Sequence, residues 1–167
     1  MLLKLKKENI MSQNQTNKNI FLNQQYKNLM IFKLFIDGIY KKISSAKQYY
    51  PDFENWYYAN VIPSILNGDK EFLFEIRNSK IVGLAIIKHS EKKLCHLSVF
   101  DGYKNRGYGL KLFEKSFQAL GTSKPYLTVS EEKYIEFKKI FNYYGFKLKY
   151  KKLNAYRKNK YEYYFNI

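Results

Sequence analysis

Apolar residues in the middle of the chain alternate with polar residues at the period of a β-strand. The alternation is clear at residues 72–76, and two further apolar segments follow at 81–89 and 94–99, with short polar turns between them. Successive side chains of a strand point to opposite faces, so this spacing predicts three strands that each bury at least one face. The short links between them predict an antiparallel meander.

Beyond residue 109 the apolar positions step by three or four, which is the period of a helix. Residues 110–120 predict an amphipathic helix with one buried stripe, closed by Gly121. Residues 125–129 are short and rich in β-forming side chains, and we expect them to lie parallel to the strand at 94–99. The remaining pattern predicts a helix at 133–144, a half-exposed strand at 146–152 and a last strand at 161–165.

The first quarter of the chain is less regular. Residues 1–25 are rich in Lys, Asn and Gln without a sustained period, and we interpret them as a mobile polar tail before a single domain at 26–167. Residues 27–35 are apolar and bulky, which favours a first strand, with a helix as the alternative. Residues 36–45 have helical spacing.

A further helix is predicted after Pro51. Asp52 is placed to cap its N-terminus, and Pro63 is expected to bend or end it, because proline lacks the backbone N–H that a helix interior needs.

Composition limits the class of protein. Hydrophobic residues make up 46% of the 167 positions and aromatic residues 19%, which excludes a disordered chain and allows one real core. No apolar run is long enough to span a bilayer, and the N-terminus lacks the apolar centre of a signal peptide. Cys95 is the single cysteine and there are two histidines, so neither a disulfide framework nor a metal cluster is expected. We expect a cytoplasmic protein with no membrane partner.

The formal net charge of +16 has two interpretations. Basic surfaces attract nucleic acid and steer anionic ligands. However, of the 30 basic residues only Arg77, Arg106 and Arg157 are arginines, and arginine is the usual choice for gripping phosphates. An A/T-rich coding sequence would also supply this excess of Lys, Asn and Tyr, so both interpretations stay open.

The segment from Leu94 to Gly109 carries the clearest chemical signal. A strand runs into a turn that ends in Lys104-Asn-Arg-Gly-Tyr-Gly109 at the start of the helix at 110–120. Backbone N–H groups in the first turn of a helix have no intrahelical partner and carry the positive end of the helix dipole. Glycines let a ligand approach these groups, so the turn predicts a seat for a phosphate or pyrophosphate, with Lys104 and Arg106 beside it.

This stretch resembles the acetyl-CoA-binding signature of the GNAT superfamily of N-acetyltransferases, Arg/Gln-x-x-Gly-x-Gly/Ala. In the family the signature lies five residues after a strand-ending Val or Ile, and here Val99 is five residues before Lys104. Gly107 and Gly109 match, and Lys104 stands where the family prefers Arg or Gln. Farther on, Ile140-Phe-Asn-Tyr-Tyr-Gly-Phe146 resembles the family's Phe-Tyr-Glu-Lys-Leu-Gly-Phe segment.

The resemblance implies a fold and a cofactor. It implies an α/β GNAT fold, a mixed and mostly antiparallel sheet of about six to seven strands with helices on both faces. The pantetheine arm of acetyl-CoA would lie in a gap between two parallel strands, held by the backbone of Leu97, Ser98 and Val99. The pyrophosphate would be held by the first turn of the helix, over the residues Lys104, Asn105, Arg106, Gly107, Tyr108, Gly109 and Leu110.

The family's usual acid is missing. It is a Tyr four residues before the Gly of the Gly-Phe pair, and this chain has Phe141 there. Tyr144 is three residues farther and shares that helix face, so we prefer it to Tyr143 as the catalytic acid. Ser130, at the end of the strand at 125–129, is a second candidate, with capping of the following helix as its alternative role.

The base is missing as well. Several relatives place a Glu six residues before the strand-ending Val, and here that residue is Lys93. His89 and His96 are candidates for a base that acts through water, with a structural role as the alternative. An α-amino group titrates near pH 7.7–8.0 and a Lys side chain near 10.4, so the lack of a matched carboxylate favours an acceptor amine of low pKa.

The leading hypothesis is an acetyl-CoA-dependent N-acetyltransferase that transfers the acetyl group directly to a primary amine. The acceptor is a small amine, a peptide N-terminus, or aminoacyl-tRNA as in the small basic GNAT toxins that the chain also resembles. The alternative is a catalytically silent GNAT fold that binds nucleic acid or a protein partner through its basic C-terminal hairpin. The oligomeric state is left open, with a homodimer as one candidate.

Overall fold

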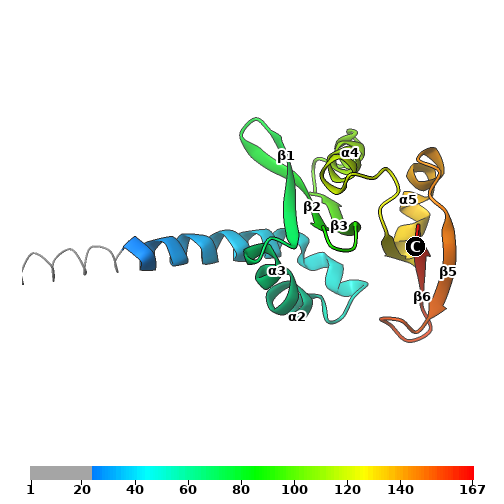
Figure 1. The fold of residues 1–167 in the computed structure, drawn as a ribbon, viewed down its shortest axis with the longest axis horizontal. Coiled ribbons are helices and arrows are strands. Elements are labelled where there is room, and N and C mark those ends of the chain that lie inside the picture. Colours follow the sequence, from blue (N-terminus) through cyan, green and yellow to red (C-terminus); the bar gives the residue numbers. More distant parts are fainter. Residues whose placement is uncertain (1–23) are drawn as a thin grey trace, which may run out of the picture. The chain divides into compact units, whose positions relative to one another are not determined.

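The computed structural model of the protein describes residues 24–167, and its first element is an uninterrupted helix over residues 24–43 (Figure 1). The strand predicted at 27–35 is therefore wrong, and the helical alternative holds. Leu29, Met30 and Leu34 are unbranched at Cβ and lose little side-chain freedom in a helix, so local propensity favours what the structure shows. Of the predicted tail, residues 24 and 25 belong to this helix and the others lie outside the described residues.

By their internal contacts, residues 1–41 and 42–167 form two units. The second unit contains every strand described below. It begins with a short 3₁₀ turn, η1 (Ser44–Gln48). Over residues 24–167, no helix is both long and apolar enough to cross a membrane.

The helix predicted after Pro51 is confirmed, but its centre is widened. It consists of α2 (Phe53–Asn55), the π-helical η2 (Trp56–Val61) and α3 (Ile62–Leu66). Pro63 does not end it: it stands at the start of α3, where a missing backbone N–H is tolerated. Asp52 stands at the N-cap, yet its carboxylate accepts from the Asn55 side chain at 3.2 Å and makes no bond to the helix backbone.

The predicted meander is confirmed as β1 (Lys70–Arg77), β2 (Lys80–Lys88) and β3 (Lys93–Val99), paired antiparallel in that order. β2 is the central strand, and its residues 82–87 are buried. A strand that is covered on both faces needs apolar side chains on both, which is why β2 reads as a continuous apolar run and not as an alternation.

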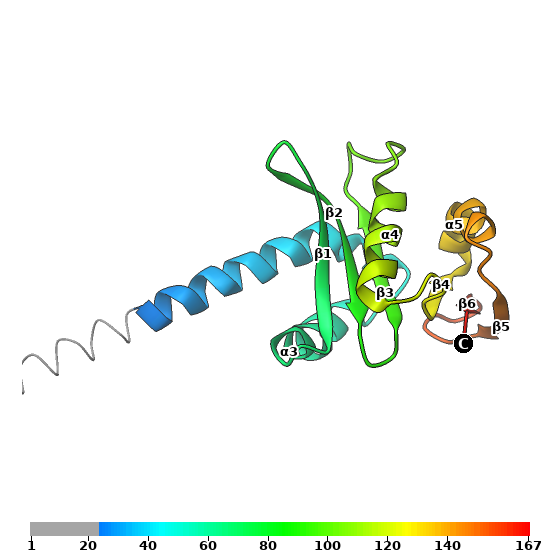
Figure 2. The same cartoon turned by 45° about the horizontal axis from the view of Figure 1, so that its top comes forward.

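Helices cover the two faces of this first sheet. The helix α4 (Tyr108–Leu120) packs on one face, where its Leu112 and Phe113 join Ala85 and Leu94 in the core (Figure 2). On the opposite face, the rings of Tyr57 and Phe72 stack at 6.3 Å between centroids. Gly121 ends α4 in a left-handed conformation, as predicted.

The C-terminal residues form a second three-stranded sheet in the order β4-β6-β5. Its strands are β4 (Leu127–Ser130), β5 (Leu148–Leu153) and β6 (Tyr161–Phe165), and the helix α5 (Glu131–Tyr143) packs on one of its faces. All six residues of β5 are exposed, so the half-exposed strand predicted there is wrong. As the edge strand, β5 lies beyond the reach of α5, which packs on β4 and β6.

The two sheets meet at one point among the described residues. A parallel bridge joins Lys93 at the start of β3 to Tyr126 just before β4. There the Leu94 N–H donates to the Tyr126 carbonyl at 2.9 Å, and the Tyr126 N–H donates to the Lys92 carbonyl at 3.1 Å. The predicted parallel relation is confirmed, but pairing stops after this bridge and the strands part (Figure 2). The α/β fold with helices on both faces is as expected.

Candidate active site

An opening of about 60 Å³ lies where β3 and β4 part. One wall is residues 94–97 of β3 and the other is residues 127–129 of β4. Its floor is aromatic and comes from the two helices: Phe113 from α4, with Phe137 and Phe141 from α5. The opening is thus apolar on its helix side and bordered on two sides by strand backbone.

The backbone of β3 has free hydrogen-bonding groups along this opening. The Phe100 N–H donates to the Val82 carbonyl of β2 at 2.9 Å, and the antiparallel ladder alternates from there. The N–H and C=O groups of Leu97 and Val99 therefore point away from β2, toward the opening, whereas those of Ser98 face β2. Beyond Leu94 no strand among the described residues pairs with this edge.

An irregularity in β3 sets which residues face the opening. Ile86 pairs with His96 but Ile87 pairs with Leu94, so Cys95 is an extra residue. Such a bulge shifts the alternation by one position. The Leu94 N–H faces β4 before the bulge, and Leu97 and Val99 take that orientation after it.

Downstream of Val99 the chain turns into α4 as the glycines predict. Gly107 is the N-cap of α4 with φ of 78°, and a Cβ built on it would meet nothing within 4 Å. A Cβ on Gly109 would lie 3.8 Å from Val99 Cγ2, so the first helical turn sits directly on the end of β3. Asn105 also has a positive φ, of 61°. These features leave space for a ligand at the first turn of α4, whose N–H groups have no intrahelical partner.

The charges around this turn are exposed. Lys104 Nζ lies 2.8 Å from Asp101 Oδ1, and the hydrogen bond raises the pKa of Lys104. Arg106 is exposed, and the guanidinium of Arg77 lies over the ring of Tyr108, 5.5 Å from its centroid. The predicted phosphate seat therefore has Arg77 as an additional neighbouring cation.

The site fits acetyl-CoA. A thioester with an extended amide arm needs free strand N–H and C=O groups, and a pyrophosphate needs accessible N–H groups at a helix N-terminus. The free backbone edge at Leu97 and Val99 offers the first, and the open space at Gly107, at the N-terminus of α4, offers the second.

The sequence candidates for the acid lie in different places. Phe141, at the position of the family's tyrosine, lines the opening and carries no hydroxyl. Ser130 is buried and caps α5, since its Oγ accepts from the Lys133 N–H at 3.4 Å. Tyr144 does not line the opening: its ring packs edge-on against Phe117 at 4.9 Å, and burial raises the pKa of its hydroxyl. Its role as the acid stays a prediction.

His96 and Cys95 lie at the opening itself. Burial lowers the pKa of His96 to about 4, so its ring is neutral at neutral pH, and its buried Nε2 has no hydrogen-bond partner among the described residues. Burial raises the pKa of the Cys95 thiol to about 11, which keeps it protonated. A neutral imidazole can donate or accept a hydrogen bond here, but it is a poor base at this pKa.

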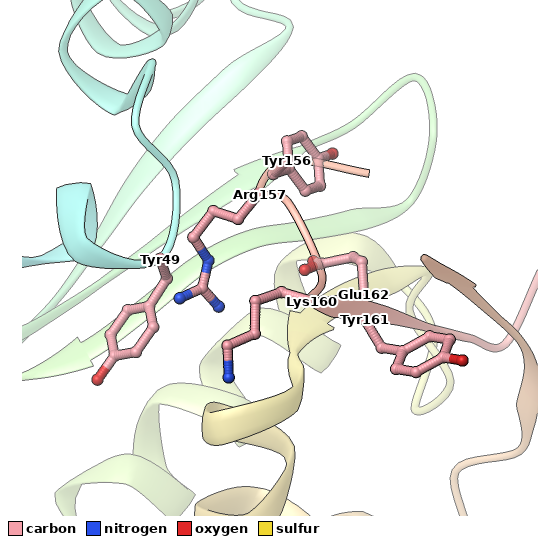
Figure 3. Close-up of a pocket in the computed structure, with 6 residues that line it drawn as sticks. All are labelled: Tyr49, Tyr156, Arg157, Lys160, Tyr161 and Glu162. Carbon is pink, nitrogen blue, oxygen red and sulfur yellow. The ribbon is translucent and has the colours of Figure 1, made fainter. Parts of the chain in front are cut away.

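Sequence reasoning missed Glu162 of β6. Glu162, drawn in Figure 3, is only 3% exposed, and its carboxylate accepts a hydrogen bond from the Tyr50 hydroxyl at 3.0 Å. Burial raises its pKa to about 7, although hydrogen bonds from Thr128 and Tyr50 act in the opposite direction. The signal was present in the sequence: a single carboxylate stands inside the strand Tyr161-Glu-Tyr-Tyr-Phe165.

Comparison with known families decides the relationship. The profile of the acetyltransferase (GNAT) domain matches residues 41–155. The protein belongs to the GNAT acetyltransferase family. No curated protein matches its sequence.

Solved GNAT structures share the fold at low sequence identity. A GNAT-family acetyltransferase from Desulfovibrio desulfuricans superposes with a TM-score of 0.54 at 16% identity, over 62% of this chain and 73% of its own. A chimera of the spermidine N-acetyltransferase SpeG from Vibrio cholerae and hSSAT superposes with a TM-score of 0.58 at 14% identity, over 78% of this chain and 88% of its own. A nourseothricin acetyltransferase superposes with a TM-score of 0.50 at 13% identity, over 59% of this chain and 65% of its own. At these identities the likeness extends to the fold alone.

The phosphate seat can be tested with Gly107→Glu. The new carboxylate would stand where the pyrophosphate is expected, and like charges in contact cost several kcal/mol, so acetyl-CoA affinity should fall by about 10²-fold or more. Titration calorimetry measures it. Gly68→Glu is the matched control, because Gly68 also has a positive φ (82°) and open space around it, but lies at the other end of the sheet. Equal affinity of the Gly107→Glu variant and the parent would show that the seat is elsewhere.

The buried carboxylate can be tested through stability. The pKa of Glu162 is about 7 in the folded protein against 4.5 ordinarily, so the folded state holds a proton that the unfolded chain has released between these values. The free energy of unfolding should therefore fall as pH rises from about 4.5 to about 7. Glu162→Gln has no carboxylate to titrate at this position. Its free energy of unfolding, measured in denaturant, should therefore increase relative to that of the parent over the same pH interval. A difference that does not change with pH would contradict the raised pKa.

Proposed function

We propose that the protein is an acetyl-CoA-dependent N-acetyltransferase that transfers the acetyl group directly to a primary amine. The observation that carries this proposal is that β3 and β4 separate near the N-terminus of α4, where Gly107 leaves space for a ligand. Family membership supports acetyl transfer, and the path from the free strand edge to Gly107 supports acetyl-CoA as the donor.

Each part of the donor would meet a different group. The arm would bond the main chain of Leu97 and Val99, and the pyrophosphate would meet the first turn of α4 with Lys104 and Arg106 nearby. A strand N–H that is fixed toward the thioester carbonyl stabilises the negative charge that develops on its oxygen. The apolar floor of Phe113 and Phe141 keeps water from the thioester.

Direct transfer needs no acyl-enzyme. The lone pair of the neutral amine attacks the carbonyl carbon, the carbon–sulfur bond breaks, and the thiolate leaves with the electron pair. The amine nitrogen still carries a surplus proton after the attack, and the thiolate can take that proton. This supports catalysis without a side-chain acid at Phe141, and the protonated thiol of Cys95 argues against an acyl carrier.

Primary amines are the proposed acceptor class. Two similar structures are named for spermidine and nourseothricin acetylation, which supports a small amine. Aminoacyl-tRNA is the second candidate, supported by the exposed lysines of the edge strand β5 and its neighbour Lys147. Of the other cations near this hairpin, Arg157 pairs with Glu132 and Lys160 with Glu131, so they add less free charge than the sequence suggests.

Purified protein with acetyl-CoA should release coenzyme A thiol only when an amine acceptor is present, and the acceptor should gain one acetyl group by mass spectrometry. If charged tRNA is the acceptor, activity should fall steeply with salt, because each neutralised phosphate releases counterions. Changing Lys147, Lys149 and Lys151 together to Gln should then raise KM for the tRNA about tenfold and reduce the salt slope by up to about 3.

A triple Gln variant at the exposed residues Lys80, Lys138 and Lys139 controls for net charge. Full activity on a small amine, without acetylation of charged tRNA at low salt, would exclude the tRNA branch. Binding of acetyl-CoA without acetylation of any amine would instead favour the catalytically silent alternative.

Tyr144 is tested by Tyr144→Phe. Its ring packs against Phe117 and Phe113, so loss of the hydroxyl should leave kcat within about threefold of the parent if the amine's own proton reaches the thiolate. Steady-state kinetics with saturating acetyl-CoA measure this, with Tyr143→Phe at the exposed neighbouring position as the control. A loss of about 10²–10⁴-fold in kcat would instead identify Tyr144 as the acid.

A further inference from the structure

Glu162 lies in a polar cluster on the face of the second sheet opposite α5. Tyr163 and Phe165 face α5, where the Tyr134 and Tyr163 rings stack at 4.6 Å. Because side chains alternate along a strand, Glu162 points to the other face. There it accepts from the hydroxyls of Tyr50 and Thr128.

Tyr50 is held as a donor to this carboxylate. Its hydroxyl oxygen accepts the Ser130 N–H at 3.2 Å while its proton goes to Glu162. Burial and the charge of Glu162 raise the pKa of Tyr50, so the hydroxyl stays protonated. The geometry of the carboxylate is therefore fixed from two directions, by Tyr50 and by β4.

This cluster borders the proposed thioester site. Thr128, whose hydroxyl acts to lower the pKa of Glu162, also lines the opening between β3 and β4. His96, on the far wall of the opening, contacts Phe53 with 5.5 Å between ring centroids. Tyr50 and Phe53 belong to the same segment of the chain, so Glu162 and His96 lie on one face of the two sheets, opposite α4 and α5.

A small cavity lies beside Glu162, which forms one of its walls. Its volume of about 10 Å³ is close to the minimum for one water, and polar groups surround it. Figure 3 shows Glu162 together with Arg157 and Tyr156 among the residues that line this cavity. The walls are Tyr49, Tyr156, Arg157, Lys160, Tyr161 and Glu162.

The cationic side chains near Glu162 form ion pairs with other carboxylates. Arg157 lies 2.6 Å from Glu132, and Lys160 lies 2.6 Å from Glu131 and 3.2 Å from Glu132. Across residues 24–167, Glu162 takes part in no ion pair of its own. A carboxylate has about four acceptor positions, so capacity remains for a water after its two hydroxyl partners.

We propose that Glu162 is the general base of the reaction, taking the proton of the acceptor ammonium through the water of this cavity. This rests on the proposed acetyl transfer. The water gives one proton to Glu162 and takes one from the ammonium, which leaves a neutral amine whose lone pair attacks the thioester. Glu162 later returns its proton to solvent by the same route, so the enzyme is regenerated and one proton is released for each acetyl group transferred.

The electrostatic surroundings suit this role near neutral pH. Burial raises the pKa of Glu162 to about 7, and a base is most effective when its pKa is near the working pH. The hydroxyls of Thr128 and Tyr50 and the charges of Arg157 and Lys93 lower it. The negative charge of Glu162 in turn contributes to the raised pKa of Tyr126, Tyr156 and Tyr164.

The test is the pH dependence of kcat/KM, with an acceptor whose own pKa is above about 9. In the parent, kcat/KM should rise with pH through about 7 as Glu162 loses its proton. In Glu162→Gln, kcat/KM should be about 10²–10⁴-fold lower at pH 7 and should no longer show the rise through pH 7, which is the limb due to Glu162. It should recover at high pH, where the acceptor ammonium loses its proton without a base. KM for acetyl-CoA should not change, and Glu91→Gln, an exposed carboxylate elsewhere, should keep the parental profile.

Tyr50→Phe separates catalysis from structure. The hydrogen bond from Tyr50 lowers the pKa of Glu162, so its removal should move the limb to higher pH while the carboxylate remains. A purely structural role for Glu162 would not move it. The proposal is overturned if Glu162→Gln keeps the limb, or if it loses activity by the same factor at every pH.

The two proposals fail in different ways. A parent that binds acetyl-CoA but acetylates no amine would overturn the proposed function, and the role of Glu162 with it. An active parent whose Glu162→Gln variant keeps the limb near pH 7 would overturn only the role of Glu162.

Discussion

The single parallel bridge between Lys93 and Tyr126 is the constraint on which the site depends. It holds β3 and β4 together at one end, and beyond it each strand follows its own antiparallel partners in a separate sheet. The edge of β3 beyond Leu94 is thereby left without a strand partner among the described residues, and residues 95–99 are partly buried. An unpaired strand edge is costly in a protein interior, so the natural occupant is a ligand that supplies the missing hydrogen bonds.

The two faces of this opening have opposite chemistry. The helix face is built from Phe113, Phe137 and Phe141, which form an apolar floor. The polar groups of the opening include His96, whose buried Nε2 has no hydrogen-bond partner among the described residues, and Thr128; Glu162, with its raised pKa, lies near Thr128 and outside the opening. Burying a carboxylate costs free energy unless it is well hydrogen-bonded, and two hydroxyls are provided for it. A buried group that reduces stability at neutral pH is more easily explained by function than by folding.

The charge of the chain is less available than its composition suggests. In the sequence, Arg157 and Lys160 look like part of a basic surface. In the structure they form ion pairs with Glu132 and Glu131, and these pairs hold the connection between β5 and β6 to the first turn of α5. These carboxylates also lie at a helix N-terminus, where negative charge is favourable. The exposed lysines of β5 remain, and whether they meet nucleic acid depends on the acceptor.

Local patterns were enough to predict the meander at 70–99, the helices after Gly107 and Ser130, and the glycine-containing turn before α4, because period, capping and glycine placement act within a few residues. The failures of sequence reasoning were also local: residues 27–35 are bulky and apolar in a way that suits strand or helix, and the π turn before Pro63 has no sequence signature. Packing between distant segments sets the features that no local pattern predicts: the sheet divides, Phe141 faces the opening while Tyr144 does not, and Tyr50 meets Glu162 across 112 residues. Such contacts depend on how distant segments pack, and no pattern within either segment encodes its partner.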